Sequence, residues 1–462
     1  MYVGKVEKTP PAKGSEIMKK EYLKEILQIG LPVTLQSILQ ASYSLVDQIM
    51  VGTLGTVSIA GGGLVGKFSS LVTFTLASIA SVTSILVSQY HGSKDKDGIS
   101  KSFFSCLYMA LAVMALFMAA CLCLPDGILS IYTTDTAMIE AAVPYFIVIA
   151  VSFLPMTLTM QFSALLRSIE RSKFPLYAGM ASMLLNVIFN YIFIFGKFGM
   201  PKLGLLGAGI GTLLSRTVEC LVQLFFILRL CQKQEIYLQP VSILKLEQYQ
   251  KIAIIVLPIL FNEFSWSVGE NIYAAIYGRI GTQAVAAMTL TNPLQGLFIG
   301  MFSGVSMAAT VMTGKRLGRD ETEEAYSIAK YLGKVGAIGS IIVSVILVVI
   351  SNVYVGIYDV EPEVAETTKR IIFVLAIYLI VKIMNMIVAG GVLRSGGKTK
   401  YTLYIDLIGT WIFGVPLGLL GAFVFKWPIE AVYALLSFEE VVRLMITLIV
   451  FKKKIWMNNV TK

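Results

Sequence analysis

The sequence predicts an all-α integral membrane protein, with about twelve transmembrane helices in two parallel six-helix lobes. Composition is the first observation: 56% of the residues are hydrophobic, 14% are charged and the mean hydropathy is +0.76, whereas soluble proteins carry roughly 25% charged residues. The second is a succession of apolar runs of about 20 residues, each long enough to cross a bilayer. The third is an internal repeat of half the chain length, which predicts that the lobes share one plan.

The repeat is visible in residues that scattered hydrophobic matches would not reproduce. An offset of 226 places these residues on one another: Leu31 on Leu257, Pro32 on Pro258, Gly52 on Gly278, Gly55 on Gly281, Gly92 on Gly318 and Tyr132 on Tyr358. An offset of 227 then continues the match: Arg167 with Arg394, Ser168 with Ser395, Lys173 with Lys400 and Arg216 with Arg443. Six spans per half is an even number, so both halves start on the same side. A pseudo-two-fold axis along the membrane normal should relate them.

The apolar segments follow one another in order along the chain. They cover roughly 26–51, 57–88, 102–124, 140–161, 174–196, 205–230, 252–277, 284–313, 328–352, 370–390, 402–425 and 429–451. The predicted organisation is a tail at 1–22, an N-lobe at 23–231, a linker at 232–250, a C-lobe at 251–452 and a tail at 453–462.

The distribution of charge predicts the orientation. Basic residues gather in the tails and in alternate loops, as at Lys5, Lys8, Lys94, Lys96, Arg171, Lys245, Lys398 and Lys452, whereas the opposite loops carry acids such as Asp126, Asp135, Glu361 and Glu363. The positive-inside rule therefore assigns both termini of a multi-pass cell-membrane protein to the cytoplasm. Because loop lysines and arginines account for the net charge of +10, we expect no nucleic-acid partner. The polar start of the chain predicts no cleavable signal peptide.

The predicted N-lobe contains a cluster of polar residues inside apolar spans. Asp47 lies in the first span, Asn186 and Asn190 share one face of the fifth, and Thr212 lies in the Gly-rich start of the sixth. Oxygen donors of this kind can hold a proton or a small hard cation, so sodium at Asp47 is one candidate. The alternative is that the asparagines only join neighbouring helices, as polar side chains do in lipid.

The seventh span carries acids and aromatic residues on one helical stripe. Glu263, Trp266, Ser267, Glu270 and Tyr273 recur at intervals of three and four. Carboxylates supply negative charge, and the faces of Trp and Tyr attract a flat or quaternary cation. The stripe therefore predicts a cation-binding lining of a cleft, against the alternative of an aromatic packing face.

Other charges in the spans have simpler interpretations. Two pairs lie three apart on one helix and can neutralise themselves: Arg216 with Glu219, and Glu440 with Arg443. Asp406 falls in the first turn of its span, where a carboxylate suits the helix dipole. Lys67 and Lys382 fit either a cleft lining or a buried ion pair.

Several classes of function are disfavoured. No Gly-x-x-x-x-Gly-Lys-Ser/Thr run is present, so nucleotide hydrolysis and a bound cofactor are not expected, and no filter signature indicates a channel. The single histidine, His91, leaves no constellation for a membrane enzyme, and the five cysteines fit core packing better than metal binding. Two lobes around a central cleft favour alternating access driven by an ion gradient.

A family resemblance rests on four features. They are the run LP…VD..MVG.LG…A of the first span, LNVIFNYIFIFG followed by GMPKLGLLGAGIGT, the matching loops at Leu166 and Leu393, and the six-plus-six repeat. Together they resemble the multidrug and toxic compound extrusion (MATE) transporters over nearly the whole chain. The resemblance implies export of small organic cations or other amphiphiles in exchange for protons or sodium, through two lobes with a V-shaped opening. We expect a monomer in the bilayer.

The resemblance also bears on single residues. Asp47 matches the first-span acid that many members use for the coupling ion, and Thr212 matches a sixth-span hydroxyl. Some members have an acid where this chain has Asn190, and others have a tenth-span acid where it has Lys382 and Asn385. The choice between proton and sodium therefore stays open. The alternative function is a flippase for a lipid-linked sugar, for which basic residues such as Lys67, Arg216 and Lys382 would face pyrophosphate.

Overall fold

The computed structural model describes residues 12–462 except 53, 55, 134, 240–245 and 357–360, and this part of the chain is helical without strands. Its helices combine into twelve long rods, in agreement with the predicted number of spans. Ten of these rods, among the described residues, are long and apolar enough to cross a membrane by themselves. The first and last rods fall outside that set, and the last carries Glu439, Glu440 and Arg443 within its length.

The first half of the chain forms one bundle, the N-lobe. Its helices in the described part are α1 (Ala12–Gly52), α2 (Thr56–Ser93), α3 (Lys96–Cys123), α4 (Pro125–Ser130), α5 (Thr136–Ser168), α6 (Lys173–Phe195) and α7 (Leu205–Gln232). The short α4 joins two rods, and Asp95 caps α3 by accepting a hydrogen bond of 2.9 Å from the Gly98 amide.

The second half forms the C-lobe, in which two rods contain π-helical turns. Its helices are α8 (Leu246–Ile280), α9 (Thr282–Gly318), α10 (Thr322–Val355), α11 (Pro362–Asn385), η1 (Met386–Leu393), α12 (Lys400–Leu407), η2 (Ile408–Gly414), α13 (Val415–Leu419), η3 (Leu420–Val424) and α14 (Ile429–Lys452). The segments η1, η2 and η3 are π-helical, and they continue the tenth and eleventh rods without a break. Wide turns of this type occur frequently at functional sites.

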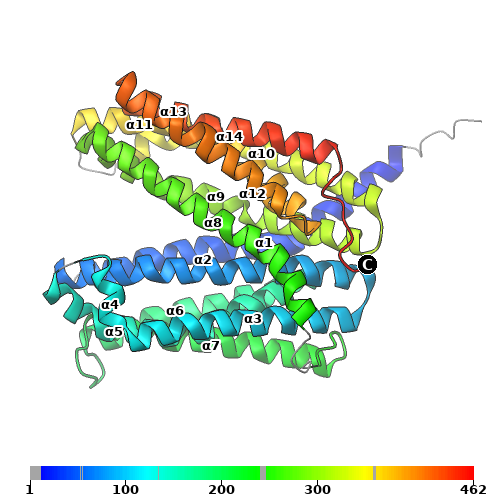
Figure 1. The fold of residues 1–462 in the computed structure, drawn as a ribbon, viewed down its shortest axis with the longest axis horizontal. Helices are drawn as coiled ribbons and strands as arrows, with labels where there is room; N and C mark the ends of the chain where they lie inside the picture. The colour runs from blue at the N-terminus through cyan, green and yellow to red at the C-terminus, as the bar shows by residue number, and fades with distance from the viewer. Residues whose placement is uncertain (1–11, 53, 55, 134, 240–245, 357–360) are drawn as a thin grey trace, which may run out of the picture.

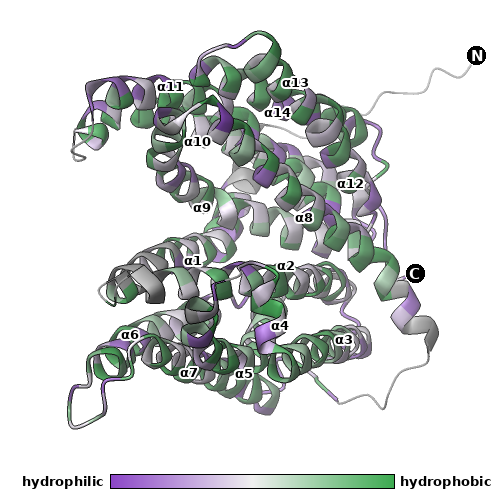
Figure 2. Ribbon diagram, turned by 60° about the vertical axis from the view of Figure 1, so that its left-hand side comes forward, coloured by the Kyte–Doolittle hydropathy of each residue, from purple (hydrophilic) through white to green (hydrophobic). Residues whose placement is uncertain are grey.

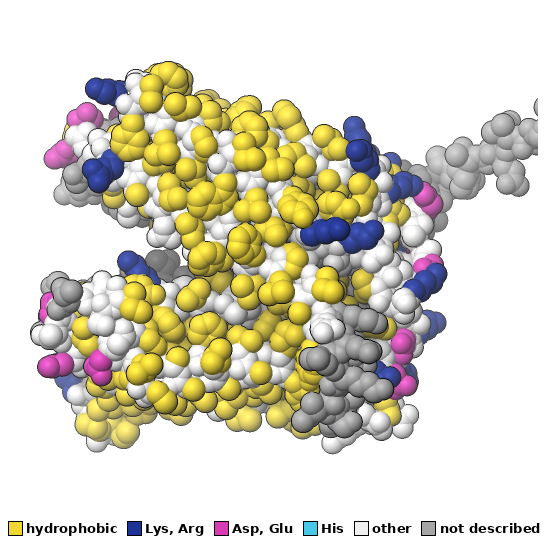
Figure 3. Space-filling view, in the orientation of Figure 1, with side chains coloured by type: hydrophobic (Ala, Val, Ile, Leu, Met, Phe, Trp, Pro, Cys, Tyr) yellow, Lys and Arg dark blue, Asp and Glu magenta, His cyan; other side chains and the backbone are white. Residues whose placement is uncertain are grey.

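The two bundles lie across from each other and diverge at one end. In Figure 2 the lower bundle holds α1–α7 and the upper bundle holds α8–α14. The lobes meet through α1 and α2 on one side and α8 and α9 on the other (Figure 1). Figure 3 shows them separated at its left end, the open end, and joined at its right end, the closed end. The last residues of the chain lie at the closed end.

Glycines bring the lobes into backbone contact near the closed end. A Cβ on Gly92 would lie 1.9 Å from the carbonyl oxygen of Lys315, and one on Gly318 would lie 1.9 Å from that of Gln89. Gly92 and Gly318 are repeat partners, so the pseudo-symmetry of the sequence appears in space as a reciprocal crossing of α2 and α9. A second crossing joins α1 to α9, where a Cβ on Gly304 would lie 2.0 Å from the oxygen of Gly30.

Ion pairs reinforce the closed end. Arg316 of α9 pairs with Glu25 of α1 at 2.9 Å, and Lys315 contacts Glu170, which follows α5. Both pairs join residues of opposite lobes and are partly buried. Charged groups and glycine crossings thus hold one end of the molecule shut.

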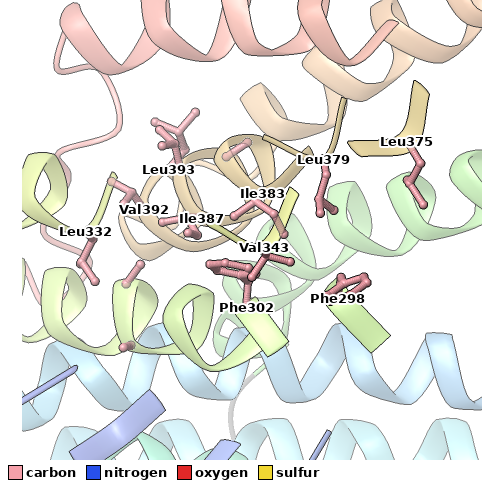
Figure 4. Packing of buried hydrophobic residues seen from close by; sticks show 14 of the residues in the cluster. Phe298, Phe302, Leu332, Val343, Leu375, Leu379, Ile383, Ile387, Val392 and Leu393 are labelled. Atoms are coloured by element: carbon pink, nitrogen blue, oxygen red, sulfur yellow. The ribbon is translucent and has the colours of Figure 1, made fainter. Parts of the chain in front are cut away.

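The outer surface and the lobe interiors are both apolar. Large side chains such as Leu116, Val349 and Val353 are 70–73% exposed, and hydrophobic residues cover much of the face in Figure 3. Such a surface suits lipid and not water. Inside the C-lobe, Phe298, Phe302 and eight labelled aliphatic residues pack together (Figure 4). Each lobe is therefore a packed body with a lipid-facing exterior.

The lobe boundaries at 23–231 and 251–452 stay predictions. The helices agree with them in outline, because α7 ends at Gln232 and α14 ends at Lys452. The helix α8 already begins at Leu246, inside the predicted linker.

Candidate functional site

The N-lobe polar cluster is buried and internally hydrogen-bonded. Asn186 and Asn190 are 1% and 0% exposed, and the Asn190 Nδ2 donates to the Asn186 Oδ1 at 2.8 Å. Asn186 in turn donates to the Ser215 Oγ at 3.2 Å, and Ser215 donates to the carbonyl oxygen of Thr212 at 3.0 Å. The structure therefore brings three of the four predicted residues together and adds Ser215.

A glycine makes room for this cluster. A Cβ on Gly211 would lie 2.2 Å from the Asn190 Oδ1, so a larger residue at this position would displace the Asn190 amide. The sequence signal was the Gly-rich start of the sixth span. Asp47 lies on α1, which packs against α6, but its side chain is outside the described residues, so its role stays a prediction.

The α8 stripe faces two cavities that share several lining residues. Glu263, Trp266 and Glu270 line a cavity of about 430 Å³, and Glu270 and Tyr273 line a neighbouring one of about 160 Å³. Ser267 is partly buried on the same helix and belongs to the lining of neither cavity. Four of the five predicted residues thus reach the cavities.

Two aromatic residues of the stripe contact neighbouring helices. Tyr273 is buried and donates a hydrogen bond to Glu439 on α14. Trp266 meets Phe74 of α2 edge to face, with ring centroids 6.4 Å apart. The stripe therefore combines the two interpretations offered by the sequence, since some members line the cavity and others pack against neighbouring helices.

A charge cluster around Arg443 completes the C-lobe site. The guanidinium lies 3.3 Å from Glu439, 3.6 Å from Glu440 and 3.6 Å from Asp406. The sequence pattern indicated the Glu440 contact, and Glu439 is a further partner on the same helix, four residues from Arg443. Asp406 belongs to another rod and is brought in by helix packing. Asp406 was expected to interact with its own helix dipole. Its partners are instead Arg443 and Asn262, whose Nδ2 donates to it at 2.8 Å.

The two lysines that the sequence left open differ in position. Lys382 lines both C-lobe cavities, as the cleft interpretation predicts. Lys67 is exposed on α2. Lys67 lines neither C-lobe cavity, and its exposure does not fit the buried ion pair.

The C-lobe cavities are lined by more acids than bases. Their titratable lining groups are Glu263, Glu270, Asp406, Glu439 and Glu440 against Lys382, Arg394 and Arg443. Five carboxylates against three cations leave a formal excess of two negative charges when all are ionised. Tyr273, Tyr277 and Tyr433 add aromatic faces to the smaller cavity. This arrangement can hold a cation.

Repeat-related arginines show how the lobes have diverged. Arg167 donates to Gln36 of α1 at 2.6 Å, and its repeat partner Arg394 pairs with Glu263 of α8 at 3.6 Å. Each arginine reaches the first helix of its own lobe. Arg394 thus pairs with a carboxylate of that helix, whereas Arg167 bonds to an uncharged amide.

Comparison with known proteins then identifies the family. The family model MatE matches residues 32–192 and 258–420, which are corresponding parts of the two lobes. The chain belongs to the MATE family. It is a membrane transporter and not an enzyme.

Relatives and solved structures of MATE transporters cover nearly the same length. The chain is 25% identical to a probable multidrug resistance protein NorM of Photorhabdus laumondii, over 86% of this chain and 87% of that one. It is 24% identical to the multidrug resistance protein MdtK of Yersinia pseudotuberculosis, over 86% and 87%. A crystal structure of the Vibrio cholerae MATE transporter VcmN matches with a TM-score of 0.87 at 18% identity, covering 95% and 98%. The MATE fold of two six-helix lobes is thereby confirmed.

Proposed function

We propose that this MATE transporter exports organic cations and related amphiphiles across the cell membrane in exchange for protons or sodium ions. The names of its relatives, NorM and MdtK multidrug resistance proteins, support efflux of several compounds. The observation that carries the substrate class is the acidic, aromatic pair of cavities beside α8. A cation entering them meets negative charge and tyrosine faces together.

Glu270 is the carboxylate best placed to meet such a substrate. It is exposed and lines both cavities. Glu263 is paired with Arg394, and Asp406, Glu439 and Glu440 surround Arg443. Among the described residues Glu270 forms no ion pair within 4 Å, so its charge is the one left for a ligand.

The coupling ion is proposed to bind in the N-lobe at Asp47, with Asn186, Asn190 and Thr212 around it. Burial of the asparagines favours a small ion over a drug-sized one. When a proton or sodium neutralises Asp47, the cluster can close, and when the site is empty the carboxylate favours access to water. The neutralised and the empty site thus stabilise different conformations of the lobe, and this difference couples ion binding to the conformational change.

Alternating access follows from the arrangement of the lobes. The glycine crossings and ion pairs close one end while the other is open, so transport requires the closed end to separate. We place the closed end and both chain termini on the cytoplasmic side, from the distribution of lysines and arginines. One chain contains both lobes and the whole opening, which supports transport by a monomer.

The flippase alternative is less well supported. Lys382, Arg394 and Arg443 do line the C-lobe cavities, but five carboxylates outnumber them. A pyrophosphate group would be repelled by that excess. The acid content of the cavities therefore favours a cationic substrate.

Transport by the purified chain in lipid vesicles tests the proposal. We expect a fluorescent organic cation to move against its concentration gradient when a proton or a sodium gradient is imposed, in the absence of ATP. Asp47→Asn keeps the shape of the side chain but fixes it neutral, and it should abolish the gradient-driven movement while leaving binding of the cation. Movement that is indifferent to both gradients would exclude ion-coupled export, and wild-type transport by Asp47→Asn would move the ion site elsewhere.

A further inference from the structure

The segment Lys453–Lys462, here called the strap, leaves α14 and crosses the closed end of the molecule. It begins in the C-lobe, where Trp456 is fully buried and stacks on Phe451 with ring centroids 5.9 Å apart. A Cβ on Gly396 would lie 1.7 Å from the carbonyl oxygen of Trp456, so the strap backbone rests directly on the loop before α12. The first part of the strap is therefore anchored in the C-lobe.

A second set of contacts holds the far end of the strap to the C-lobe surface. Asn459 donates to Asp320 at 2.8 Å, and Lys462 pairs with the same carboxylate at 3.0 Å. Both hydrogen bonds lower the pKa of the Asp320 carboxyl group, and the one from Asn459 contributes most. Asp320 follows α9, so this tie also stays within one lobe.

One residue of the N-lobe reaches the strap from the opposite side. Gln89 of α2 is fully buried, and its Nε2 donates to the carbonyl oxygens of Ser395 at 2.7 Å and Asn458 at 3.2 Å. Its Oε1 accepts a hydrogen bond of 2.7 Å from the Val460 amide. A single amide side chain is thus bonded at both its ends to the other lobe and to the strap.

Gln89 also marks the crossing of the two lobes. Its carbonyl oxygen is the atom that a Cβ on Gly318 would strike at 1.9 Å. Val460 adds apolar contact, because it packs against a hydrophobic cluster that contains residues of both lobes, such as Ile85 of α2 and Ile252 of α8. The strap therefore covers the point where α2 and α9 are closest.

We propose that the strap is a latch that holds the two lobes together at the closed end and is released from Gln89 each time that end opens. The contacts define the weak point. Trp456 and Asp320 keep the strap on the C-lobe, whereas in the described part of the chain Gln89 is the N-lobe residue that hydrogen-bonds to it. Opening leaves a buried amide and three backbone groups to be solvated. The latch thereby sets the balance between the two access states, and it rests on the proposed alternating access.

The size of the effect follows from the number of hydrogen bonds. Each bond of this kind shifts an equilibrium roughly fivefold. Losing all three bonds in Gln89→Ala, or the two bonds to the strap in its deletion, should raise the population of molecules open at this end by at least about tenfold. A stabilised closed end also predicts slower cycling in the intact protein than in one without the latch.

Distance measurements between spin labels test the latch without relying on transport. The labels are placed on cysteines at Lys96 of the N-lobe and Ser327 of the C-lobe, both exposed, in full-length protein whose five native cysteines are changed to serine. In lipid nanodiscs, Gln89→Ala and deletion of Met457–Lys462 should each increase the longer-distance population. Lys462→Ala is the matched control, because it breaks only the tie to Asp320 and should leave the distribution unchanged.

Two results would overturn the latch. One is an unchanged distance distribution in both the Gln89→Ala and the deletion variants, and the other is an equal shift in Lys462→Ala. If Gln89→Ala fails to accumulate in the membrane, the deletion variant carries the test, since it keeps Trp456 and Gln89. A shift in distances together with no gradient-driven transport by the parent protein would refute the proposed function and leave the latch standing.

Discussion

At the scale of single residues, the charge on Glu270 should decide which compounds bind. Glu270→Gln removes the carboxylate that has no ion-pair partner among the described residues, and keeps its shape. In a partly dry cavity we expect binding of organic cations to weaken about tenfold, or roughly 1.4 kcal/mol, with little change for neutral amphiphiles. Binding to purified protein, followed by fluorescence or calorimetry, measures the difference.

Glu366→Gln is the matched control for that substitution. Glu366 is an exposed carboxylate near the open end, where it pairs with Arg370 at 3.6 Å and lines neither of the cavities beside α8. The substitution Glu366→Gln should leave the binding of organic cations unchanged. Equal losses for cationic and neutral compounds in Glu270→Gln would indicate a folding defect and not a lost electrostatic contact.

At the scale of helices, the crossing of α2 and α9 should depend on its glycines. Gly318→Ala places a methyl group 1.9 Å from the Gln89 oxygen, which α2 can relieve only by moving away. We expect a loss of about 1–3 kcal/mol from the closed arrangement. The measurement is the distance between the labels at Lys96 and Ser327, which should lengthen.

The same helix supplies the control. Gly296 lies on α9 with nothing within 4 Å of its Cβ position, so Gly296→Ala should leave the distance unchanged. It should also be neutral or slightly stabilising, because alanine favours a helix. A Gly318→Ala protein with the distances of the parent would show that the lobes do not depend on this close approach.

At the scale of the whole molecule, the orientation predicted from loop charges can be tested by labelling. Single cysteines at Lys94 and Lys400 are exposed near the closed end, and one at Asp126 is exposed on the other side of the predicted membrane. With an impermeant thiol reagent outside intact cells, only Asp126→Cys should react. Reaction of all three would contradict the twelve-span topology, and reaction of only the first two would invert it.

Much of the architecture is determined by sequence alone. The length of the apolar runs, the repeat of Leu31–Pro32 at Leu257–Pro258, and the even number of spans per half fix two parallel lobes. The reason is that bilayer thickness imposes a helix length and that backbone groups in lipid must bond within their own helix. The stripe on α8 could also be predicted from the sequence, because helical periodicity places residues three and four apart on one face.

Only the tertiary structure decided which charges meet. Arg443 was expected to pair with Glu440 three residues away, yet it also draws in Asp406 from another rod, and Lys67 proved to be exposed whereas Lys382 lines the cavities. The hydrogen bond between Gln89 and Val460 of the strap joins residues 371 positions apart, and no periodic pattern in the sequence predicts it. Periodicity reports one helix at a time, whereas contacts between helices depend on how whole rods cross, and that is set by packing over the entire chain.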